Sequence, residues 1–112
     1  MYKVTLTQII EKMELKNLLP DIDTDSIDIN QSGVNRIALQ LAGFFEHFDS
    51  ERIQVIGKVE YAYLEQFDPE HMIPIYEKIF ESKIPCIIFC RGLEPSDTML
   101  DMAERAGVPI LI

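Results

Sequence analysis

A short turn near the end of the chain holds residues that could bind a small ligand. It follows the apolar stretch Cys86–Cys90 and carries Arg91, Gly92, Glu94 and Ser96. If the apolar stretch is a strand of a parallel sheet, the turn lies at its carboxyl end, where open α/β sheets bind ligands. Glycine lets the backbone approach a ligand closely, and Ser96 or Asp97 can cap a following helix whose first N–H groups favour an anion. These residues fit a pocket for a phosphate or nucleotide group. A tight turn closed by a helix cap explains them as well, and the residues alone favour it.

A second candidate group lies in the segment 34–43, where Asn35, Arg36 and Gln40 interrupt an apolar run. The segment predicts a helix that starts near Asn35, runs through Ala42 and is ended by Gly43. On such a helix Arg36 and Gln40 are four residues apart and share one face. That face fits a ligand or partner surface and equally a plain solvent-exposed stripe.

No residue pattern in the chain indicates catalysis or a metal site. The two histidines, His47 and His71, have no Ser, Cys or acidic residue at a catalytic spacing, and we interpret both as surface residues. The acidic stretch Asp21–Asp25 fails the EF-hand pattern, because Ser26 and Ser32 stand where a calcium loop needs Gly and Glu. Neither common glycine-rich phosphate loop is found. The sequence therefore predicts no catalytic residue, no metal ligand, no bound cofactor and no phosphoryl-transfer chemistry in this chain.

The two cysteines, Cys86 and Cys90, lie on the same face of the proposed strand, roughly 13 Å apart at about 3.3 Å per residue. A disulfide between them is excluded by its Cα limit of about 7 Å. Two cysteines without a histidine at ligand spacing also do not make a zinc site. We predict that both thiols are mostly buried and reduced, as in a cytoplasmic protein.

Charge and composition exclude several classes of partner. The 112 residues carry 19 acidic and 10 basic side chains, a net charge of −9, and 47% of them are hydrophobic. Nucleic acids and anionic membranes bind clustered Lys and Arg, so neither is expected as a partner. No stretch of about 18 apolar residues predicts a membrane span, and the first residues lack a signal-peptide pattern. Size and composition fit a single globular domain.

Two dipeptides near the end of the chain, Ile84-Pro85 and Val108-Pro109, share one pattern: a helix ends, a β-branched residue precedes proline, and an apolar strand begins. Proline at the start of a strand removes no ladder hydrogen bond, and it holds the preceding residue extended. Both strands therefore start from the same side of the sheet and are predicted to be parallel, with right-handed crossovers. We predict a three-layer α/β domain with a small, mostly parallel sheet flanked by helices. The predicted strands are Arg52–Gly57, Cys86–Cys90 and Pro109–Ile112, with a short one at Ser26–Ile29. The predicted helices are Thr5–Met13, Arg36–Ala42, Val59–Gln66, Ile75–Ser82 and Asp97–Arg105. Thr5 or Thr7 can cap the first helix, and Thr5 with Gln8 has the spacing of a capping box.

The chain ends on three apolar residues, Ile110, Leu111 and Ile112, inside the last predicted strand. We therefore expect residues 1–112 to be one domain of a longer protein. An extension of about ten residues should raise its stability or remove weak self-association, because it would cover apolar surface.

Several segments follow one another in a characteristic order: 35–45 (Asn-Arg-Ile-Ala-Leu-Gln-Leu-Ala-Gly-Phe-Phe), 52–57 (Arg-Ile-Gln-Val-Ile-Gly), Glu60 with Tyr63-Leu64, 84–88 (Ile-Pro-Cys-Ile-Ile), 91–95 (Arg-Gly-Leu-Glu-Pro) and 106–109 (Ala-Gly-Val-Pro). In this order they resemble the N-terminal domain of the HPr kinase/phosphorylase family, which is itself similar to the uridine-nucleotide-binding first domain of the MurE and MurF ligases. One departure is Ile37-Ala38, where the family usually has Pro-Gly, and it puts the local backbone in doubt.

The resemblance implies the non-catalytic N-terminal domain of a bifunctional bacterial enzyme that controls carbon catabolite repression. That family phosphorylates a serine of the phosphocarrier HPr with ATP or pyrophosphate and removes the phosphate by phosphorolysis. Its phosphate loop, and with it the site for ATP and Mg²⁺, belongs to a C-terminal kinase domain, so the resemblance transfers no catalytic residue to this chain. The implied partners are that kinase domain, further copies in a hexamer, and HPr through the whole enzyme. The implied role of the domain itself is assembly or ligand sensing.

Two alternatives stay open. The pattern at the last strand also resembles the DRTGG domain, a regulatory module found beside other enzymes, which would make the chain a ligand-sensing or nucleotide-binding module unrelated to HPr. A purely structural oligomerisation domain would show defined self-association without nucleotide binding. A phosphate loop in the following hundred residues of the gene would favour the kinase.

Overall fold

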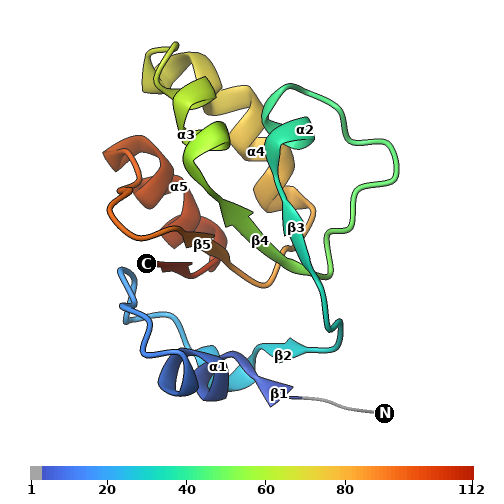
Figure 1. Cartoon of the computed structure of the whole chain (residues 1–112), viewed down its shortest axis with the longest axis vertical. Coiled ribbons are helices and arrows are strands. Elements are labelled where there is room, and N and C mark those ends of the chain that lie inside the picture. The colour runs from blue at the N-terminus through green and yellow to red at the C-terminus, as the bar shows by residue number, and fades with distance from the viewer. Residues whose placement is uncertain (1–3) are drawn as a thin grey trace.

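A sheet of four parallel strands forms the middle of the molecule (Figure 1). The computed structural model describes residues 4–112. The strands lie in the order β3 (Val34–Arg36), β4 (Ile53–Ile56), β5 (Ile87–Phe89) and β6 (Ile110–Leu111). Because neighbours in the sheet are also neighbours in the chain, right-handed crossovers all pass on one side of it. The connecting helices must therefore cover a single face.

Four helices cover that face. They are α2 (Ala38–Leu41), α3 (Lys58–Leu64), α4 (Ile73–Glu81, preceded by the 3₁₀ turn η2, Pro69–Met72) and α5 (Asp97–Ala106). Because side chains alternate between the two faces along a strand, Ile56, Phe89 and Ile110 point towards these helices. They pack there in one cluster with Ile79 and Met99. We name this cluster the helix-side core. Its buried members are Leu19, Ile37, Leu41, Ile56, Met72, Tyr76, Ile79, Phe80, Ile84, Ile87, Phe89, Met99, Ala103, Val108 and Ile110.

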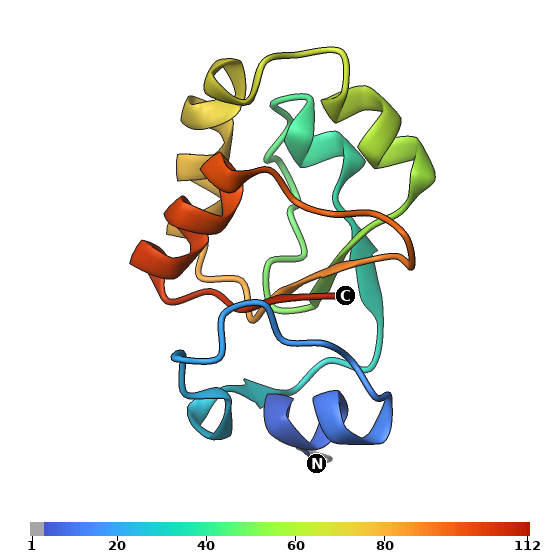
Figure 2. The same ribbon diagram turned by 90° about the vertical axis from the view of Figure 1, so that its left-hand side faces the viewer.

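Residues 4–30 cover the opposite face, as Figure 2 shows from the side. This N-terminal unit consists of β1 (Val4–Thr5), α1 (Leu6–Lys12), the 3₁₀ turn η1 (Thr24–Ser26) and β2 (Asp28–Ile29), with β1 and β2 paired antiparallel. Leu6 and Ile29 pack against Ile53, Cys86 and Leu111 of the sheet, and we name these five residues the N-terminal core. The segment after α1 then runs along β6, because Lys16 and Ile112 exchange backbone hydrogen bonds of 2.9 and 3.0 Å.

The predicted three-layer α/β architecture is confirmed. The two proline-led strands pair in parallel, with Ile87 opposite Ile110. The predicted capping box is also present, since Thr5 Oγ1 accepts the Gln8 N–H at 3.2 Å and Gln8 Oε1 accepts the Thr5 N–H at 2.9 Å. Gly43, at φ +95°, follows the end of α2 as predicted.

The predicted helix from Asn35 is wrong in its first part. Residues Val34–Arg36 form β3, a fourth strand that pairs in parallel with β4, and the helix begins only at Ala38. The apolar spacing of this segment suits a helix, but Asn35 lies opposite Gln54 of β4 and donates a hydrogen bond to its side chain. A long-range amide pair thus overrides the local pattern. Arg36 and Gln40 accordingly do not share a helix face.

The predicted burial of both cysteines holds for Cys86 and is wrong for Cys90. Both residues face the N-terminal unit, as their even spacing requires. The unit covers the sheet only at the Cys86 end, so that Ile88 is half-buried and Cys90 is exposed.

Among residues 4–112, no helix is both long enough and apolar enough to cross a lipid bilayer.

Candidate functional site

The carboxyl ends of β3, β4 and β5 meet at one edge of the sheet, and both predicted groups of site residues lie there. This edge is where ligands bind in open parallel sheets. Three arrangements occupy it: an ion pair, a network of amide side chains, and a cavity beside the loop 91–96. Among residues 4–112, no hydrogen bond or ion pair joins the group around Arg36 to that loop.

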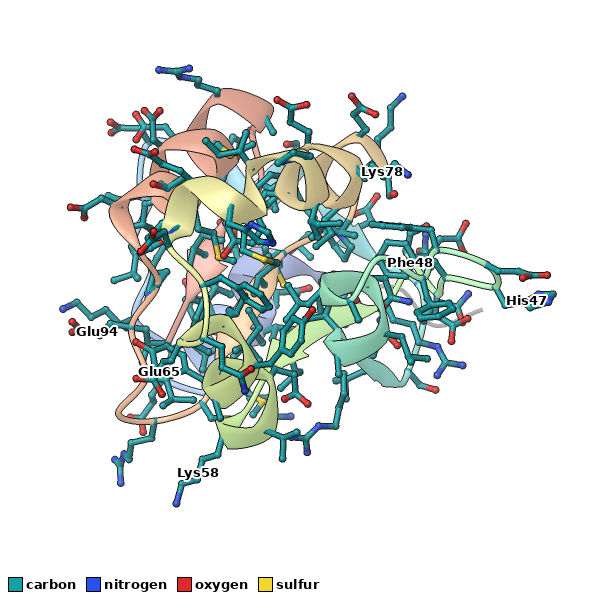
Figure 3. The ribbon with its side chains drawn as sticks, turned by 90° about the horizontal axis from the view of Figure 1, so that it is seen from above. His47, Phe48, Lys58, Glu65, Lys78 and Glu94 are labelled. Atoms are coloured by element: carbon teal, nitrogen blue, oxygen red, sulfur yellow. The ribbon has the colours of Figure 1, made fainter. Side chains whose placement is uncertain are left out.

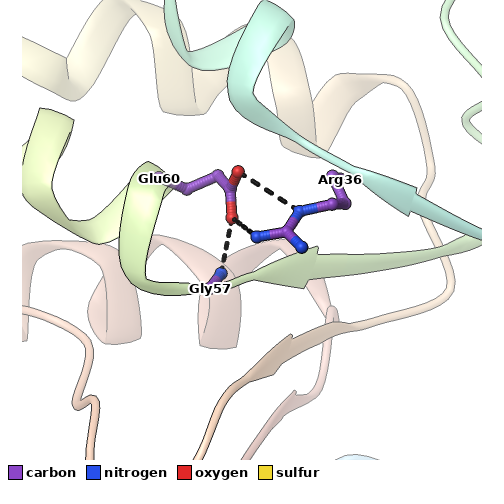
Figure 4. Close-up of polar contacts among 3 residues, drawn as sticks. All are labelled: Arg36, Gly57 and Glu60. Carbon is purple, nitrogen blue, oxygen red and sulfur yellow. Dashed lines mark hydrogen bonds and ion pairs between the residues drawn. The ribbon is translucent and has the colours of Figure 1, made fainter.

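The ion pair connects the end of β3 to the first turn of α3 (Figure 4). Arg36 Nη2 donates to Glu60 Oε1 at 3.0 Å, and Arg36 Nε lies 3.4 Å from Glu60 Oε2. The backbone N–H of Gly57 donates to the same Glu60 Oε1 at 2.6 Å. The Glu60 carboxylate is thus held by one cation and one helix N-terminal amide, although its side chain is only 3% exposed.

Burial alone would raise the pKa of Glu60, because it disfavours the charged form. The hydrogen bonds from Arg36 and the Gly57 N–H outweigh this effect and hold the pKa of Glu60 below its usual range. Glycine at position 57 leaves room for the pair, since a Cβ there would lie 2.5 Å from Arg36 Nη2. The Arg36 side chain is 60% exposed, so its outer nitrogens remain open to solvent.

The amide network connects β3 and β4 on the face of the sheet opposite to Arg36. Asn35 Nδ2 donates to Gln54 Oε1 at 2.6 Å and to Gln40 Oε1 at 3.1 Å. The fully buried Gln54 donates in turn to the backbone carbonyls of Asp49 and Arg52, at 3.0 and 2.8 Å. These bonds tie the loop before β4 to the sheet. The structure therefore uses Asn35 and Gln40 to hold α2 and this loop in place.

The loop 91–96 has an exposed first part, and a second part that is hydrogen-bonded to the neighbouring helices. Arg91 and Gly92 are exposed, and Gly92 adopts φ +85°, which favours glycine. Ser96 caps α5 as predicted, because its Oγ accepts the Met99 N–H at 3.2 Å. The Glu94 backbone carbonyl accepts the Tyr61 hydroxyl at 2.9 Å, which anchors the loop to α3.

Beside this loop, α3, η2, α4 and the start of α5 enclose a cavity of about 340 Å³. Four aromatic residues, five other apolar residues, two exposed glutamates and one serine line it: Tyr61, Phe67, Tyr76, Phe89, Leu64, Pro69, Met72, Pro95, Met99, Glu65, Glu94 and Ser96. Glu65 and Glu94 lie on the same side of the molecule in the view from above, far from His47 (Figure 3). Of the predicted site residues, the cavity thus gathers Glu94 and Ser96, whereas Arg91 and Gly92 do not line it.

This geometry suits binding better than catalysis. Within the part of the chain that the structure describes, no group of three or more His, Cys, Asp or Glu side chains could hold a metal ion. His47 is exposed, and His71 stacks on Phe67 with ring centroids 4.8 Å apart. The exposed His47 lies 3.8 Å from Glu46 Oε1, and neither histidine is hydrogen-bonded to a Ser, Thr or Cys side chain among residues 4–112.

Sequence reasoning did not single out four residues of these arrangements as site residues: Glu60, Gln54, Tyr61 and Tyr76. Glu60 could have been identified from the sequence, because an acidic residue three positions after a helix N-cap can accept a hydrogen bond from the backbone N–H of that N-cap. Gln54 was visible as a polar residue in an apolar strand. The two tyrosines meet through tertiary packing, which no local spacing reports.

The fold and site define a small parallel α/β domain with a ligand-sized cavity at its carboxyl edge. A sequence model described as "HPr Serine kinase N terminus" matches residues 4–112, and the chain belongs to this family. The HPr kinase/phosphorylase of Lachnoclostridium phytofermentans is 50% identical over 110 residues, which cover 98% of this chain and 36% of that protein. The HPr kinase/phosphorylase of Caldicellulosiruptor bescii is 37% identical over 111 residues, covering 99% and 36%. The chain thus spans about a third of the length of these relatives.

One solved structure resembles the whole domain. It contains the CBS and DRTGG domains of the regulatory region of Clostridium perfringens pyrophosphatase, complexed with the activator diadenosine tetraphosphate. The likeness has a TM-score of 0.58 and 16% sequence identity and covers 96% of this chain and 40% of that one. At this identity the likeness establishes a shared fold.

Proposed function

We propose that this chain is the non-catalytic N-terminal domain of a bifunctional HPr kinase/phosphorylase that acts in carbon catabolite repression. The observation that carries the proposal is the match to the N-terminal family over residues 4–112, at 50% identity to a protein of that name. The proposed partners are the kinase domain of the same protein, which would hold ATP and Mg²⁺, further copies of the enzyme in a hexamer, and HPr. The proposed location is the cytoplasm.

Within that enzyme we assign the domain a role in assembly or ligand sensing. The ion pair and amide network make a rigid edge, and the adjacent cavity offers a binding volume within the range of small-molecule sites. The sequence of the chain has neither of the common glycine-rich phosphate loops that phosphoryl-transfer enzymes use.

The first test is activity of the chain alone. Purified chain incubated with ATP, Mg²⁺ and HPr should form no phosphoserine-HPr above a blank, while the intact Lachnoclostridium phytofermentans enzyme serves as the positive control. Phospho-HPr formed by the chain would overturn the non-catalytic assignment.

The second test is replacement. A chimera that carries this chain in place of the matching 110 residues of the Lachnoclostridium phytofermentans protein should assemble like the parent and phosphorylate HPr. This expectation rests on the 50% identity over 110 residues. A folded chimera that fails to assemble would instead favour a free-standing regulatory module of the DRTGG kind.

A further inference from the structure

Tyr76 in α4 is a buried residue whose hydroxyl has no hydrogen-bond partner among residues 4–112. The residue is 3% exposed, and no hydrogen bond within residues 4–112 uses its hydroxyl. Burial raises the pKa of Tyr76 to about 12, so the hydroxyl stays protonated at neutral pH. Buried phenols usually have a hydrogen-bond partner, because an unpaired polar group is costly.

One cavity beside Tyr76 can give its hydroxyl access to solvent or to a ligand. No completely enclosed side-chain nitrogen or oxygen in the described residues lacks a partner, so the Tyr76 hydroxyl must keep some accessible surface. The Tyr76 ring lines the 340 Å³ cavity beside the loop 91–96. This cavity therefore offers the hydroxyl a place to meet a ligand group.

The charge of the cavity wall selects the ligand. Glu65 and Glu94 line it, and neither carboxylate takes part in an ion pair among residues 4–112. No Lys, Arg or His is among the lining residues, so a phosphate would meet two acidic side chains and no cationic one. Both carboxylates accept hydrogen bonds and donate none.

The rest of the wall is aromatic. Tyr61 and Phe89 pack edge to face with ring centroids 6.4 Å apart, and Phe67 adds a third ring. Aromatic rings bind flat apolar groups and attract cations to their faces. The tyrosine hydroxyl of Tyr61 is already committed to the Glu94 carbonyl, which leaves Tyr76 as the free phenol.

We propose that this cavity binds a small planar organic cation, such as an aryl amidinium or guanidinium, whose N–H groups donate to Glu65, Glu94 and the Tyr76 hydroxyl. The proposal deepens the ligand-sensing part of the proposed function and rests on it only for its biological meaning. It reverses the ligand charge that the turn 91–96 predicts from sequence, because Arg91 lies outside the cavity.

The experiment uses benzamidine as the probe, with benzoate and benzyl alcohol as matched anionic and neutral rings. Each is titrated into the chain and followed by calorimetry and by the aromatic resonances of the protein. We expect benzamidine to bind at least about 10-fold more tightly than either analogue, which corresponds to about 1.4 kcal/mol. The aromatic resonances of Tyr61 and Phe89 should shift with the bound fraction.

Two pairs of variants locate the binding site. Tyr76→Phe should weaken benzamidine binding about 5- to 10-fold, and Tyr63→Phe, the same change outside the lining, should leave it unchanged. Glu65→Gln should weaken binding, whereas Glu11→Gln on α1, with the same charge change across the sheet, should not (Figure 1). Without a ligand, Tyr76→Phe should keep or raise Tm, because it removes a hydroxyl with no partner.

Equal affinity for benzamidine and benzoate would overturn the proposal. So would an equal effect of Glu65→Gln and Glu11→Gln, which would mean general attraction to an acidic protein. A clear drop in Tm for unliganded Tyr76→Phe would mean that the hydroxyl has a protein partner. These readouts use the chain alone and no HPr, so failure here leaves the non-catalytic assignment untouched, and activity of the chain would overturn only that assignment.

Discussion

Glu60 shows how a single residue can join two elements at the carboxyl edge. Its carboxylate takes two kinds of donor, the Arg36 guanidinium from β3 and the Gly57 amide at the start of α3. The carboxylate is nearly enclosed, while the guanidinium is largely exposed. Loss of the arginine would leave a buried negative charge, whereas loss of the carboxylate would leave an exposed and easily hydrated cation.

Arg36→Ala should therefore destabilise the domain at pH 7 by more than the loss of an exposed ion pair does, because Glu60 stays buried with only the Gly57 N–H as donor. In the wild type the lowered pKa of Glu60 contributes stability that is present above roughly pH 4.3, the value for a free glutamate, and is lost as pH falls through the folded pKa. In the variant the two Arg36 contributions that lower the pKa of Glu60 are lost, so this pKa should be higher than in the wild type. Protonation of Glu60, which removes the buried charge, should then occur at a higher pH. Urea unfolding at pH 7 and pH 4 should show a smaller cost at pH 4.

Arg105→Ala is the matched control, since Arg105 and Asp101 pair at the same 3.0 Å but lie on the surface of α5. Such an exposed pair contributes roughly 0.3–0.5 kcal/mol. Equal costs for the two arginines, or no change with pH, would contradict the role assigned to Glu60.

The two thiols should differ sharply in reactivity. Burial raises the pKa of Cys86 to about 12, so almost no thiolate exists at neutral pH, and the side chain is enclosed in the N-terminal core. Cys90 is exposed. A thiol reagent at pH 8 should modify one cysteine rapidly in the wild type and none rapidly in Cys90→Ser. Rapid modification of two thiols in the native protein would contradict the burial of Cys86.

At the scale of elements, local chemistry predicts where helices and strands begin better than it predicts which segments pair. The proline pattern at Ile84-Pro85 and Val108-Pro109 gives two parallel strands, and the Thr5 and Ser96 caps place two helix starts. Strand β3 could not be predicted in this way, because three residues are too few to show an alternating pattern. The side chain that pairs with its Asn35, that of Gln54, is nineteen residues away. Of the candidate site, the edge and the residues Glu94 and Ser96 follow from sequence, but the cavity depends on how α3 and α4 pack.

The cap of α5 gives an element-scale prediction. Ser96→Ala removes the acceptor of the Met99 N–H at the start of a ten-residue helix and should cost about 1 kcal/mol. Ser82→Ala is the control, because Ser82 Oγ donates only to the Lys78 carbonyl on an exposed surface at the end of α4. Its cost should stay within about 0.5 kcal/mol. Equal urea midpoints for Ser96→Ala and the wild type would contradict the capping role.

At the scale of the whole molecule, the sheet order explains why the N-terminal unit is needed. Sequential parallel strands place every crossover helix on one face, so the apolar residues of the other face need a separate cover. The N-terminal unit provides it through Leu6 and Ile29, and only over the part of the sheet near Cys86. The domain thus has two cores of unequal size that meet across one thin sheet.

This division predicts that the N-terminal unit can open before the rest of the domain unfolds. Leu6 is fully buried, and Leu6→Ala should cost about 2–5 kcal/mol through lost burial and a cavity. The lost stability belongs to the N-terminal core, which contains both Leu6 and Cys86. The Cys86 thiol should therefore become reactive at urea concentrations where the helix signal in circular dichroism is still native. Labelling is followed in a Cys90→Ser background.

Met99→Ala is the control for a global effect, because Met99 is equally buried but belongs to the helix-side core. It should cost a similar free energy and yet expose Cys86 only as the helices melt, since the N-terminal unit keeps its own contacts. If Cys86 labelling follows the circular dichroism transition in both variants, the domain unfolds as one unit and the two cores are fully coupled. Early labelling in Leu6→Ala alone would identify the N-terminal unit as the part of the domain that opens first, which leaves the carboxyl edge and its cavity on the more stable side of the sheet.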